Sequence, residues 1–210
     1  MARPRSNISE RIREAACLRF LADGVDGASL RAIAADAKTS IGMVYYYYPS
    51  KEALFFAVVD QAYGALVSDL SVALAEEHSV DQRLRRFYRR LGELSEAELR
   101  VLRLVLCELL KSTDRFERLV ERFQSGHVAL IAHAVKQAFS EGRFAAGRHP
   151  LVAMVSLVSL AGVAQVVARV AGSRSPFPGA PRGAELSDEL VDVLLHGLSN
   201  PPTPKAKLSP

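Results

Sequence analysis

The sequence predicts an all-α protein, and three observations support that fold class. No proline stands between Pro49 and Pro150, so long uninterrupted helices are allowed there. Threonine, which is favoured in strands, occurs only three times in the 210-residue chain. No Asn-Gly or Asp-Gly pair links two runs of alternating hydrophobicity, as the turn of a β-hairpin would.

Composition indicates a soluble globular chain, long enough for one large or two modest domains. Hydrophobic residues make up 49%, charged residues 24%, and the net charge of +4 allows a nucleic-acid partner without requiring one. Cys17 and Cys107 lie in apolar helical patterns without metal-ligand spacing, so we expect buried free thiols in a reducing cytoplasm. Residues 1–16 lack the apolar run of a signal peptide.

Three helices are expected in the first fifty residues. The first is capped by Ser9 and runs to about Ala22, the second covers 29–37, and the third covers 40–47. A serine opens each of the last two, and a tight turn at 38–39 joins them. Such a pair is a helix-turn-helix, whose second helix enters the major groove of DNA.

The stretch IGMVYYYYPSK, residues 41–51, carries the strongest sign of function. Because successive helical residues point about 100° apart, at least one or two of the four consecutive tyrosines must face outward. An exposed tyrosine hydroxyl can donate to a phosphate oxygen. Pro49 ends this helix, Ser50 can cap the next one, and Lys51 lies in its first turn beside free N–H groups. The stretch therefore suits a phosphate backbone.

Residues 8–56, roughly, resemble the DNA-binding domain of TetR-family transcriptional regulators. The residues that carry this resemblance are Ile12, Ala16, Phe20, Gly24, Ser29, Ile33, Ala34, Ala37, Ser40, Gly42, Tyr45, Tyr47, Tyr48, Pro49, Ser50, Lys51, Glu52 and Leu54. The resemblance implies a dimeric, ligand-responsive repressor, in which the rest of the chain is a helical effector-binding and dimerisation domain. It also implies that Tyr45 and Tyr47 contact the DNA backbone or base edges and that Lys51 contacts phosphate.

The DNA-binding set expected on this basis is Ser29, Arg31, Lys38, Thr39, Ser40, Ile41, Met43, Tyr45, Tyr46, Tyr47 and Lys51. Ile41 and Met43 lack strong hydrogen-bonding groups, which favours contacts with thymine methyl groups or readout of DNA shape. Ile33, Ala34 and Val44 are expected in the core, because short helices need an apolar face.

Two positions depart from the family pattern. Lys38 stands where the turn usually has glycine, so it must accept a left-handed backbone at some cost or add a phosphate contact. Tyr48 replaces the usual phenylalanine, so its hydroxyl needs a partner if the ring is buried.

The predicted organisation is a helix-turn-helix domain at 1–51, a ligand-binding and dimerisation domain at 52–198, and a disordered tail at 199–210. Helical segments of the second domain are expected at 52–75, 83–90, 95–112, 115–141, 151–168 and about 185–198, with a breaker-rich linker at 172–183. The arginines of 83–90 are expected to form a solvated face, the alternative being a second nucleic-acid site or an anion-binding wall.

A small, largely apolar effector is expected to bind among the helices of 84–139 and to lower the affinity for DNA. The predicted lining is Phe87, Leu91, Leu102, Leu106, Cys107, Glu108, Phe116, Phe123 and His127, the alternative being that these residues fill a core. Glu108 either pairs with an arginine, the commoner outcome, or anchors the effector. No cofactor is expected, nor a metal, because His127 and His133 do not share a helix face.

Residues 151–168 are uncharged and long enough to raise a transmembrane interpretation. We reject it, because the run contains serines, a glycine and a glutamine and follows a DNA-binding domain, and we expect a buried helix apolar on nearly all sides. With the last helix it should form a four-helix dimer seam, as the resemblance also suggests. The predicted interface residues are Met154, Val158, Gly162, Gln165, Leu190 and Leu194.

Three classes of function compete. An enzyme would need a convergent catalytic group, and the sequence has no glycine-rich phosphate loop, no HExxH and no histidine near a plausible serine or cysteine motif. A membrane-associated or purely structural protein would explain only 151–168. The residues 29–51 favour a DNA-binding protein over both alternatives. Together with the resemblance, which implies a homodimeric repressor, we expect a cytoplasmic, non-enzymatic protein whose partners are double-stranded operator DNA and a small-molecule effector.

Overall fold

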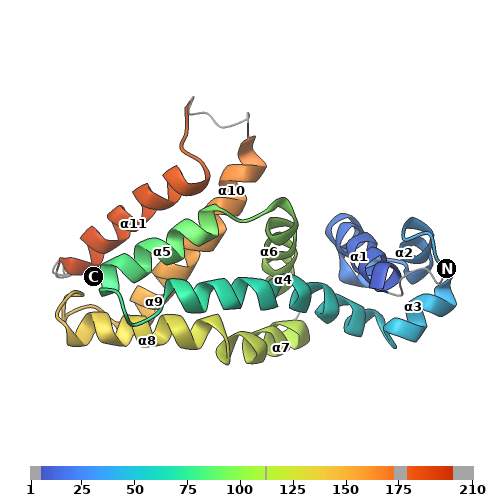
Figure 1. The fold of residues 1–210 in the computed structure, drawn as a ribbon, viewed down its shortest axis with the longest axis horizontal. Helices are drawn as coiled ribbons and strands as arrows, with labels where there is room; N and C mark the ends of the chain where they lie inside the picture. Colours follow the sequence, from blue (N-terminus) through green and yellow to red (C-terminus); the bar gives the residue numbers. More distant parts are fainter. Residues whose placement is uncertain (1–5, 112, 173–178, 201–210) are drawn as a thin grey trace, which may run out of the picture. The chain divides into compact units, whose positions relative to one another are not determined.

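The computed structural model describes residues 6–111, 113–172 and 179–200, and these residues contain helices and no strand, which confirms the all-α fold class. The N-terminal elements are α1 (Ser6–Gly27), α2 (Leu30–Asp36), α3 (Ile41–Tyr47) and α4 (Lys51–Ala73) (Figure 1). They are followed by α5 (Val80–Gly92), α6 (Glu96–Leu109), α7 (Thr113–Gln124), α8 (His127–Ser140), α9 (Pro150–Val158), the π-helix η1 (Ser159–Val163), α10 (Ala164–Ala171) and α11 (Gly183–Ser199). Most of the predicted tail, residues 201–210, lies outside the described residues.

Two compact units divide the chain. Unit 1 consists of Met1–Leu66 and Ser95–Val120, and unit 2 consists of Val67–Leu94 and Glu121–Pro210. The helices α4 and α7 therefore each contribute residues to both units.

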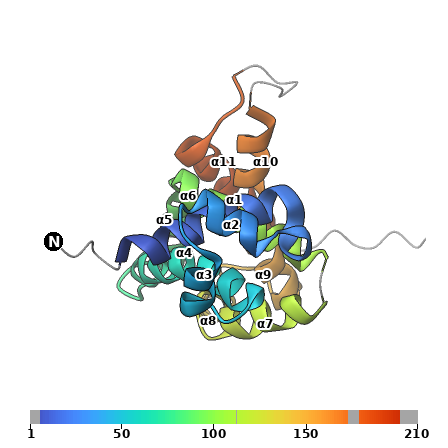
Figure 2. The ribbon, with the colours of Figure 1, turned by 90° about the vertical axis from the view of Figure 1, so that its right-hand side faces the viewer.

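Unit 1 contains the three predicted N-terminal helices, which pack beside one another (Figure 2). Its core includes Ile12, Ile33 and Val44, all fully buried, and the rings of Phe20 and Phe55 meet edge to face. The sequence predicted a core position for both Ile33 and Val44, and this is confirmed. The helix α6 packs against α1 from a distant part of the sequence.

The start of α1 differs from the expectation. The helix already includes Ser6, so Ser9 is an interior residue and not its N-cap. The Ser9 hydroxyl instead lies 2.7 Å from the Tyr48 hydroxyl and accepts a hydrogen bond from Arg13 Nη1 at 2.7 Å. Gly24, at φ 75°, breaks the helical geometry near the end of α1.

Unit 2 is built around α5 and α11, which lie side by side (Figure 1). The contact is close at Gly92, where an added Cβ atom would lie 2.5 Å from Ser187 Oγ and 2.6 Å from the carbonyl oxygen of Gly183. Across unit 2, α8 packs against α9, and the buried Tyr88 hydroxyl donates to the carbonyl oxygen of Leu157 at 3.0 Å.

The expected solvated arginine face is wrong for Arg83, which is buried and donates from Nη1 to Gln137 Oε1 at 2.6 Å. Three further arginines of α5 form ion pairs inside unit 2: Arg85 with Asp192, Arg89 with Asp188, and Arg90 with Asp69. The face therefore serves largely to join α5 to its neighbours.

Two of the long predicted helices differ in detail. The segment predicted at 115–141 is two helices, because the chain turns at 125–126 between α7 and α8. The segment predicted at 151–168 extends over 150–171 and contains the π-helix η1. It is also less buried than expected: 22% of its most apolar 18-residue window is buried.

By length and composition alone, two helices in the described part of the chain could cross a membrane, Lys51–Ala73 and Pro150–Ala171, a test that core helices of soluble proteins also pass. Cys17 and Cys107 are both free thiols, as expected. Cys17 is buried, whereas Cys107 is only half-buried, so the prediction of burial is wrong for the second thiol.

Candidate nucleic-acid interface

The α2–turn–α3 segment begins each helix with a capping serine. Ser29 Oγ accepts from the N–H of Ala32 at 3.5 Å, and Ser40 Oγ accepts from the N–H of Met43 at 3.2 Å. Each serine satisfies one of the backbone donors that the first turn of a helix leaves free. Both predicted caps are confirmed, and they fix where α2 and α3 begin.

The turn between these helices holds Lys38 at φ 52°, in the left-handed region that glycine usually occupies. The turn is closed by hydrogen bonds from the Lys38 N–H to Ala35 O and from the Thr39 N–H to Ala34 O, both at 3.0 Å. The Lys38 side chain is exposed. The structure thus confirms the strained backbone that the sequence predicted, and it leaves the charge available to an anion.

The predicted DNA-binding residues around this turn differ in exposure. Tyr45 and Tyr46 expose 54% and 74% of their surface. Ser29, Arg31, Lys38 and Ser40 are also exposed, whereas Thr39, Ile41, Met43 and Tyr47 are half-buried. The segment therefore presents hydroxyl groups and two cations to solvent beside smaller apolar areas.

Tyr48 is buried and turns away from this surface. Its hydroxyl accepts from Arg13 Nη1 at 2.9 Å and lies 2.7 Å from Ser9 Oγ. The sequence predicted that a buried hydroxyl at this position would need a partner, and this is confirmed. These contacts tie α3 to α1 and so hold the tyrosine run in place.

Lys51 occupies a different environment from the one that a direct phosphate contact would suggest. Its Nζ donates to the carbonyl oxygen of Asp26 at 2.5 Å and to that of Ala28 at 3.2 Å. An ammonium group has three donors, so two carbonyl oxygens leave one for another acceptor. The structure places Lys51 as a support of the loop between α1 and α2.

The predicted effector residues are divided between the two units. In unit 1, Leu102, Leu106 and Cys107 are half-buried, Phe116 is exposed, and the buried Glu108 accepts from Arg115 Nε at 2.6 Å. Glu108 therefore has the arginine partner that was the commoner expectation.

In unit 2, Phe87 and Leu91 are buried. The rings of Phe123 and His127 lie 5.1 Å apart between centroids, and burial lowers the pKa of His127 to about 4. His127 is therefore a neutral imidazole at neutral pH.

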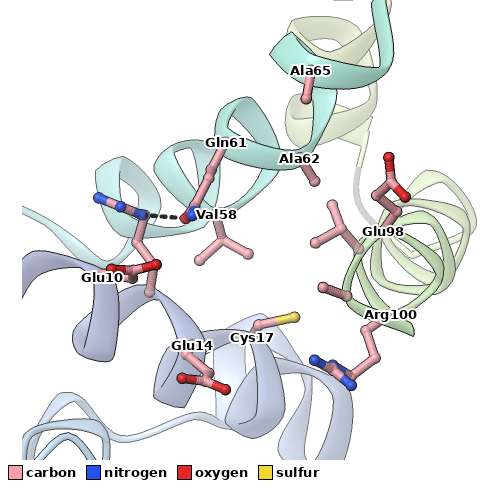
Figure 3. Close-up of a pocket in the computed structure, with 12 residues that line it drawn as sticks. Glu10, Glu14, Cys17, Val58, Gln61, Ala62, Ala65, Glu98 and Arg100 are labelled. Atoms are coloured by element: carbon pink, nitrogen blue, oxygen red, sulfur yellow. Dashed lines mark hydrogen bonds between the residues drawn. The ribbon is translucent and has the colours of Figure 1, made fainter. Parts of the chain in front are cut away.

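Unit 1 also contains a cavity of about 380 Å³ that the sequence did not predict (Figure 3). It lies between α1, α4 and α6, and its lining residues are Glu10, Arg13, Glu14, Cys17, Val58, Gln61, Ala62, Ala65, Ala97, Glu98, Arg100 and Val101. Burial raises the pKa of the Cys17 thiol, which keeps it protonated at neutral pH. The sequence feature that could have indicated this cavity is the set of small side chains Ala62, Ala65 and Ala97, because small side chains leave space between helices.

The predicted dimer residues also separate into two groups. Gln165 and Leu194 are buried inside unit 2, and Gln165 Nε2 donates to Ser187 Oγ at 2.9 Å. Met154, Val158, Gly162 and Leu190 are half-buried. Sequence reasoning missed an exposed aliphatic row on the same helices, formed by Leu151, Val152, Val155, Val163, Val167, Val170 and Val193.

Among the described residues, no group of three His, Cys, Asp or Glu side chains lies together as metal ligands would. The exposed α2–turn–α3 surface, which gathers hydroxyl groups and two cations, is the candidate site.

Residues 12–58 match the family model of bacterial regulatory proteins, tetR family. None of the curated proteins matches the chain. A Clostridium perfringens protein assigned as a fatty acid metabolism regulator has a similar fold, with 21% identity, a TM-score of 0.76, and coverage of 89% of this chain and 97% of that one.

Two further solved structures share the fold. The transcriptional regulator FadR from Bacillus subtilis, in complex with stearoyl-CoA, is 14% identical, with a TM-score of 0.72 and coverage of 90% of this chain and 98% of that one. The ketosteroid transcriptional regulator KstR2 of Mycobacterium tuberculosis is 17% identical, with a TM-score of 0.67 and coverage of 95% and 97%.

Proposed function

We propose that the chain is a cytoplasmic homodimeric repressor of the tetR family, released from its operator by a small, largely apolar effector. The match of residues 12–58 to the family model of bacterial regulatory proteins, tetR family, supports this proposal. The observation that supports this proposal most directly is the exposed α2–turn–α3 surface. Its hydroxyl groups and cations match the donors that position a protein on duplex DNA.

Different residues of this surface are expected to contact the phosphates and the bases of DNA. Lys38 and the hydroxyls of Tyr45 and Tyr46 are exposed and would contact phosphate oxygens. Ile41 and Met43, in the first turn of α3, would contact thymine methyl groups in the major groove. Specificity would then depend on methyl contacts and DNA shape more than on hydrogen bonds to base edges.

The exposed aliphatic row on α9, η1 and α10 supports the dimer. Leu151 and Val167 expose 60% and 59% of their surface, and neither side chain can hydrogen-bond to water. A two-fold partner would remove the row from water, and each valine or leucine buried contributes about 1.5–3 kcal/mol. Two helix-turn-helix domains would then read a roughly palindromic site.

The effector class is supported by the chemistry of similar folds. One neighbour was solved in complex with stearoyl-CoA, and another is named a ketosteroid transcriptional regulator. Acyl-CoA esters and ketosteroids both carry large apolar parts. In unit 2, the predicted lining residues Phe87, Leu91 and Phe123 are likewise apolar, with His127 as the polar group.

Selection of bound duplexes from a random DNA pool tests the DNA-binding part. The selected site should bind more tightly than random duplex, and Lys38→Ala should weaken binding to both while lowering the slope of log affinity against log salt by about 1. Lys136→Ala, an exposed lysine of α8 in unit 2, is the matched control and should change neither quantity. A protein that enriches no sequence would contradict the proposal.

The effector part is tested by thermal shift with acyl-CoA esters and sterols. A compound that stabilises the protein should weaken DNA binding, and by linkage the DNA should weaken binding of that compound by the same factor. Phe123→Ala and His127→Ala should reduce the stabilisation. If a compound stabilises both variants as much as the wild type, the effector site does not include Phe123 and His127.

A further inference from the structure

A chain of charged contacts inside unit 1 joins α6 and α7 to the loop that precedes α2. Glu108 on α6 is 1% exposed and accepts from Arg115 Nε at 2.6 Å. Arg115 Nη2, on α7, donates to Asp26 Oδ2 at 2.6 Å. The backbone carbonyl of the same Asp26 accepts from Lys51 Nζ, which also binds Ala28. Arg115 thus holds one carboxylate from α6 and one from the end of α1.

This chain of contacts ends at the start of α2. Ala28 directly precedes Ser29, whose hydroxyl caps α2, and the Ala28 N–H donates to Gly24 O at 3.0 Å. Residues 26–28 are therefore held by a side chain on one side and through their carbonyl oxygens on the other. Any displacement of this loop moves the cap of α2 and with it Arg31, one residue into the helix.

The two ends of the network differ in what they contribute to folding. Glu108 is a buried carboxylate, so it requires its arginine partner and fixes the position of Arg115. The Asp26 side chain is 83% exposed, and an ion pair of such an exposed group contributes little to folding stability. The hydrogen bond from Arg115 lowers the pKa of Asp26 below its usual value.

A second arginine of α7 makes a parallel contact. Arg118 Nη1 lies 2.9 Å from Glu52 Oε1 in the first turn of α4, one residue after Lys51. Arg115 and Arg118 are three residues apart and therefore share a face of α7. This face of α7 thus contacts the chain just before α2 and just after α3.

We propose that Arg115, fixed by Glu108, is a positioning residue that holds residues 26–29, from the end of α1 to the cap of α2, in the conformation required for DNA binding. The proposal rests on the proposed function, since it concerns the same DNA surface. It assigns Asp26 and Arg115 a role that requires no contact with DNA.

The sign of one substitution separates positioning from simple electrostatics. If Asp26 were only a surface carboxylate near a polyanion, Asp26→Asn would strengthen DNA binding by removing repulsion. If Asp26 positions the loop, Asp26→Asn weakens binding, by about tenfold for the loss of one well-placed contact, with the thermal midpoint nearly unchanged. Affinity would be measured by fluorescence anisotropy with the selected duplex.

Asp69→Asn is the matched control. Asp69 is also an exposed aspartate that accepts from a mostly buried arginine, since Arg90 Nε donates to it at 2.8 Å, but this pair lies in unit 2. The control should leave DNA affinity unchanged. A double substitution, Asp26→Asn with Arg115→Lys, should weaken binding no more than the worse of the two single changes, because both weaken the same contact.

Amide hydrogen exchange tests the proposal independently of DNA. In Asp26→Asn, exchange should become faster at residues 28–33, where the N–H groups of Ala28 and Ile33 are now bonded to Gly24 O and Ser29 O, and it should not change in Asp69→Asn. If the wild type binds no duplex but exchange rises as expected, the positioning role stands and the proposed function falls. Unchanged exchange, or tighter DNA binding by Asp26→Asn, would overturn the positioning role.

Discussion

The surface of α3 and the surface of the α9–η1–α10 helix both expose large side chains, but of different kinds. On α3 the exposed groups are Tyr45 and Tyr46, which end in hydroxyls. On α9 to α10 they are leucine and valine, for example Val155 and Val167, which offer no hydrogen bond. Exposure alone is common on protein surfaces, so the chemistry of the exposed groups is the informative part. The first surface suits a polyanion in water, and the second suits another apolar helix.

The largest effect is expected on dimerisation, from the double substitution Val155→Glu and Val167→Glu, which tests whether the α9–η1–α10 surface contacts another helix. Both side chains are exposed in the single chain, so it should still fold, whereas an interface would have to bury two carboxylates. The dimer dissociation constant should rise more than about 100-fold. Sedimentation equilibrium measures it, and Val72→Glu, an equally exposed valine on α4, should leave association unchanged. An unaffected dimer would assign the interface to another surface.

A second substitution should disturb unit 2 while sparing the α2–turn–α3 surface. Gly92→Ala would place a methyl group within 2.7 Å of atoms of Ser187 and Gly183, so α5 and α11 must separate. The expected loss is about 1–3 kcal/mol of unfolding free energy, measured by urea denaturation. In Gly197→Ala the added methyl group meets no atom within 4 Å, so this control should be neutral or slightly stabilising. Equal effects of the two changes would contradict the close contact.

Acidification should also act on unit 2 through His127. Its folded-state pKa, about 4, lies below the unfolded value of roughly 6.5, so the unfolded chain binds more protons between these values. The unfolding free energy should therefore fall by about 1–3 kcal/mol as the pH drops from 6.5 to 4. His127→Gln should flatten this part of the stability profile.

The smallest effect is expected at the turn before α3. Lys38→Gly should relieve the left-handed backbone and raise the unfolding free energy by about 0.5–1 kcal/mol, while the lost charge weakens DNA binding. Lys38→Ala retains the strain, so it should weaken DNA binding equally without the gain in stability. If Lys38→Gly raises the unfolding free energy and lowers the affinity for DNA, the result would support a role of this turn in DNA binding. A parallel fall of both would point to a structural role.

The parts of the fold that sequence predicted well depend on local signals. Ser29 and Ser40 precede apolar helical patterns directly, and each caps the helix that follows it. The left-handed turn at Lys38 and the hydroxyl partner of Tyr48 also followed from their immediate positions in the family pattern. The roles of these residues at DNA remain predictions.

The parts that sequence missed depend on residues far away along the chain. Ser9 was expected to cap α1, but its hydroxyl pairs with Tyr48, 39 residues later. Arg83 was expected in solvent, but it is buried and donates to Gln137, 54 residues later. Helical periodicity carries no information on such pairings. The cavity of unit 1 was missed for the same reason, since three separate helices line it.

The π-helix Ser159–Val163 has a consequence for how far the apolar row can run straight. Four members of the exposed aliphatic row, Leu151, Val155, Val163 and Val167, are spaced by multiples of four residues, and Ser159 is exposed at the remaining position of this spacing. In a regular α-helix such a row would drift around the axis by roughly 40° per step, or ~160° from first to last. A π turn holds one extra residue and takes back roughly 100° of that rotation. If all of these residues formed a regular α-helix, Val167 would be turned by roughly 100° from its present direction, so the extra residue of the π turn keeps the exposed positions nearer to one side of the helix.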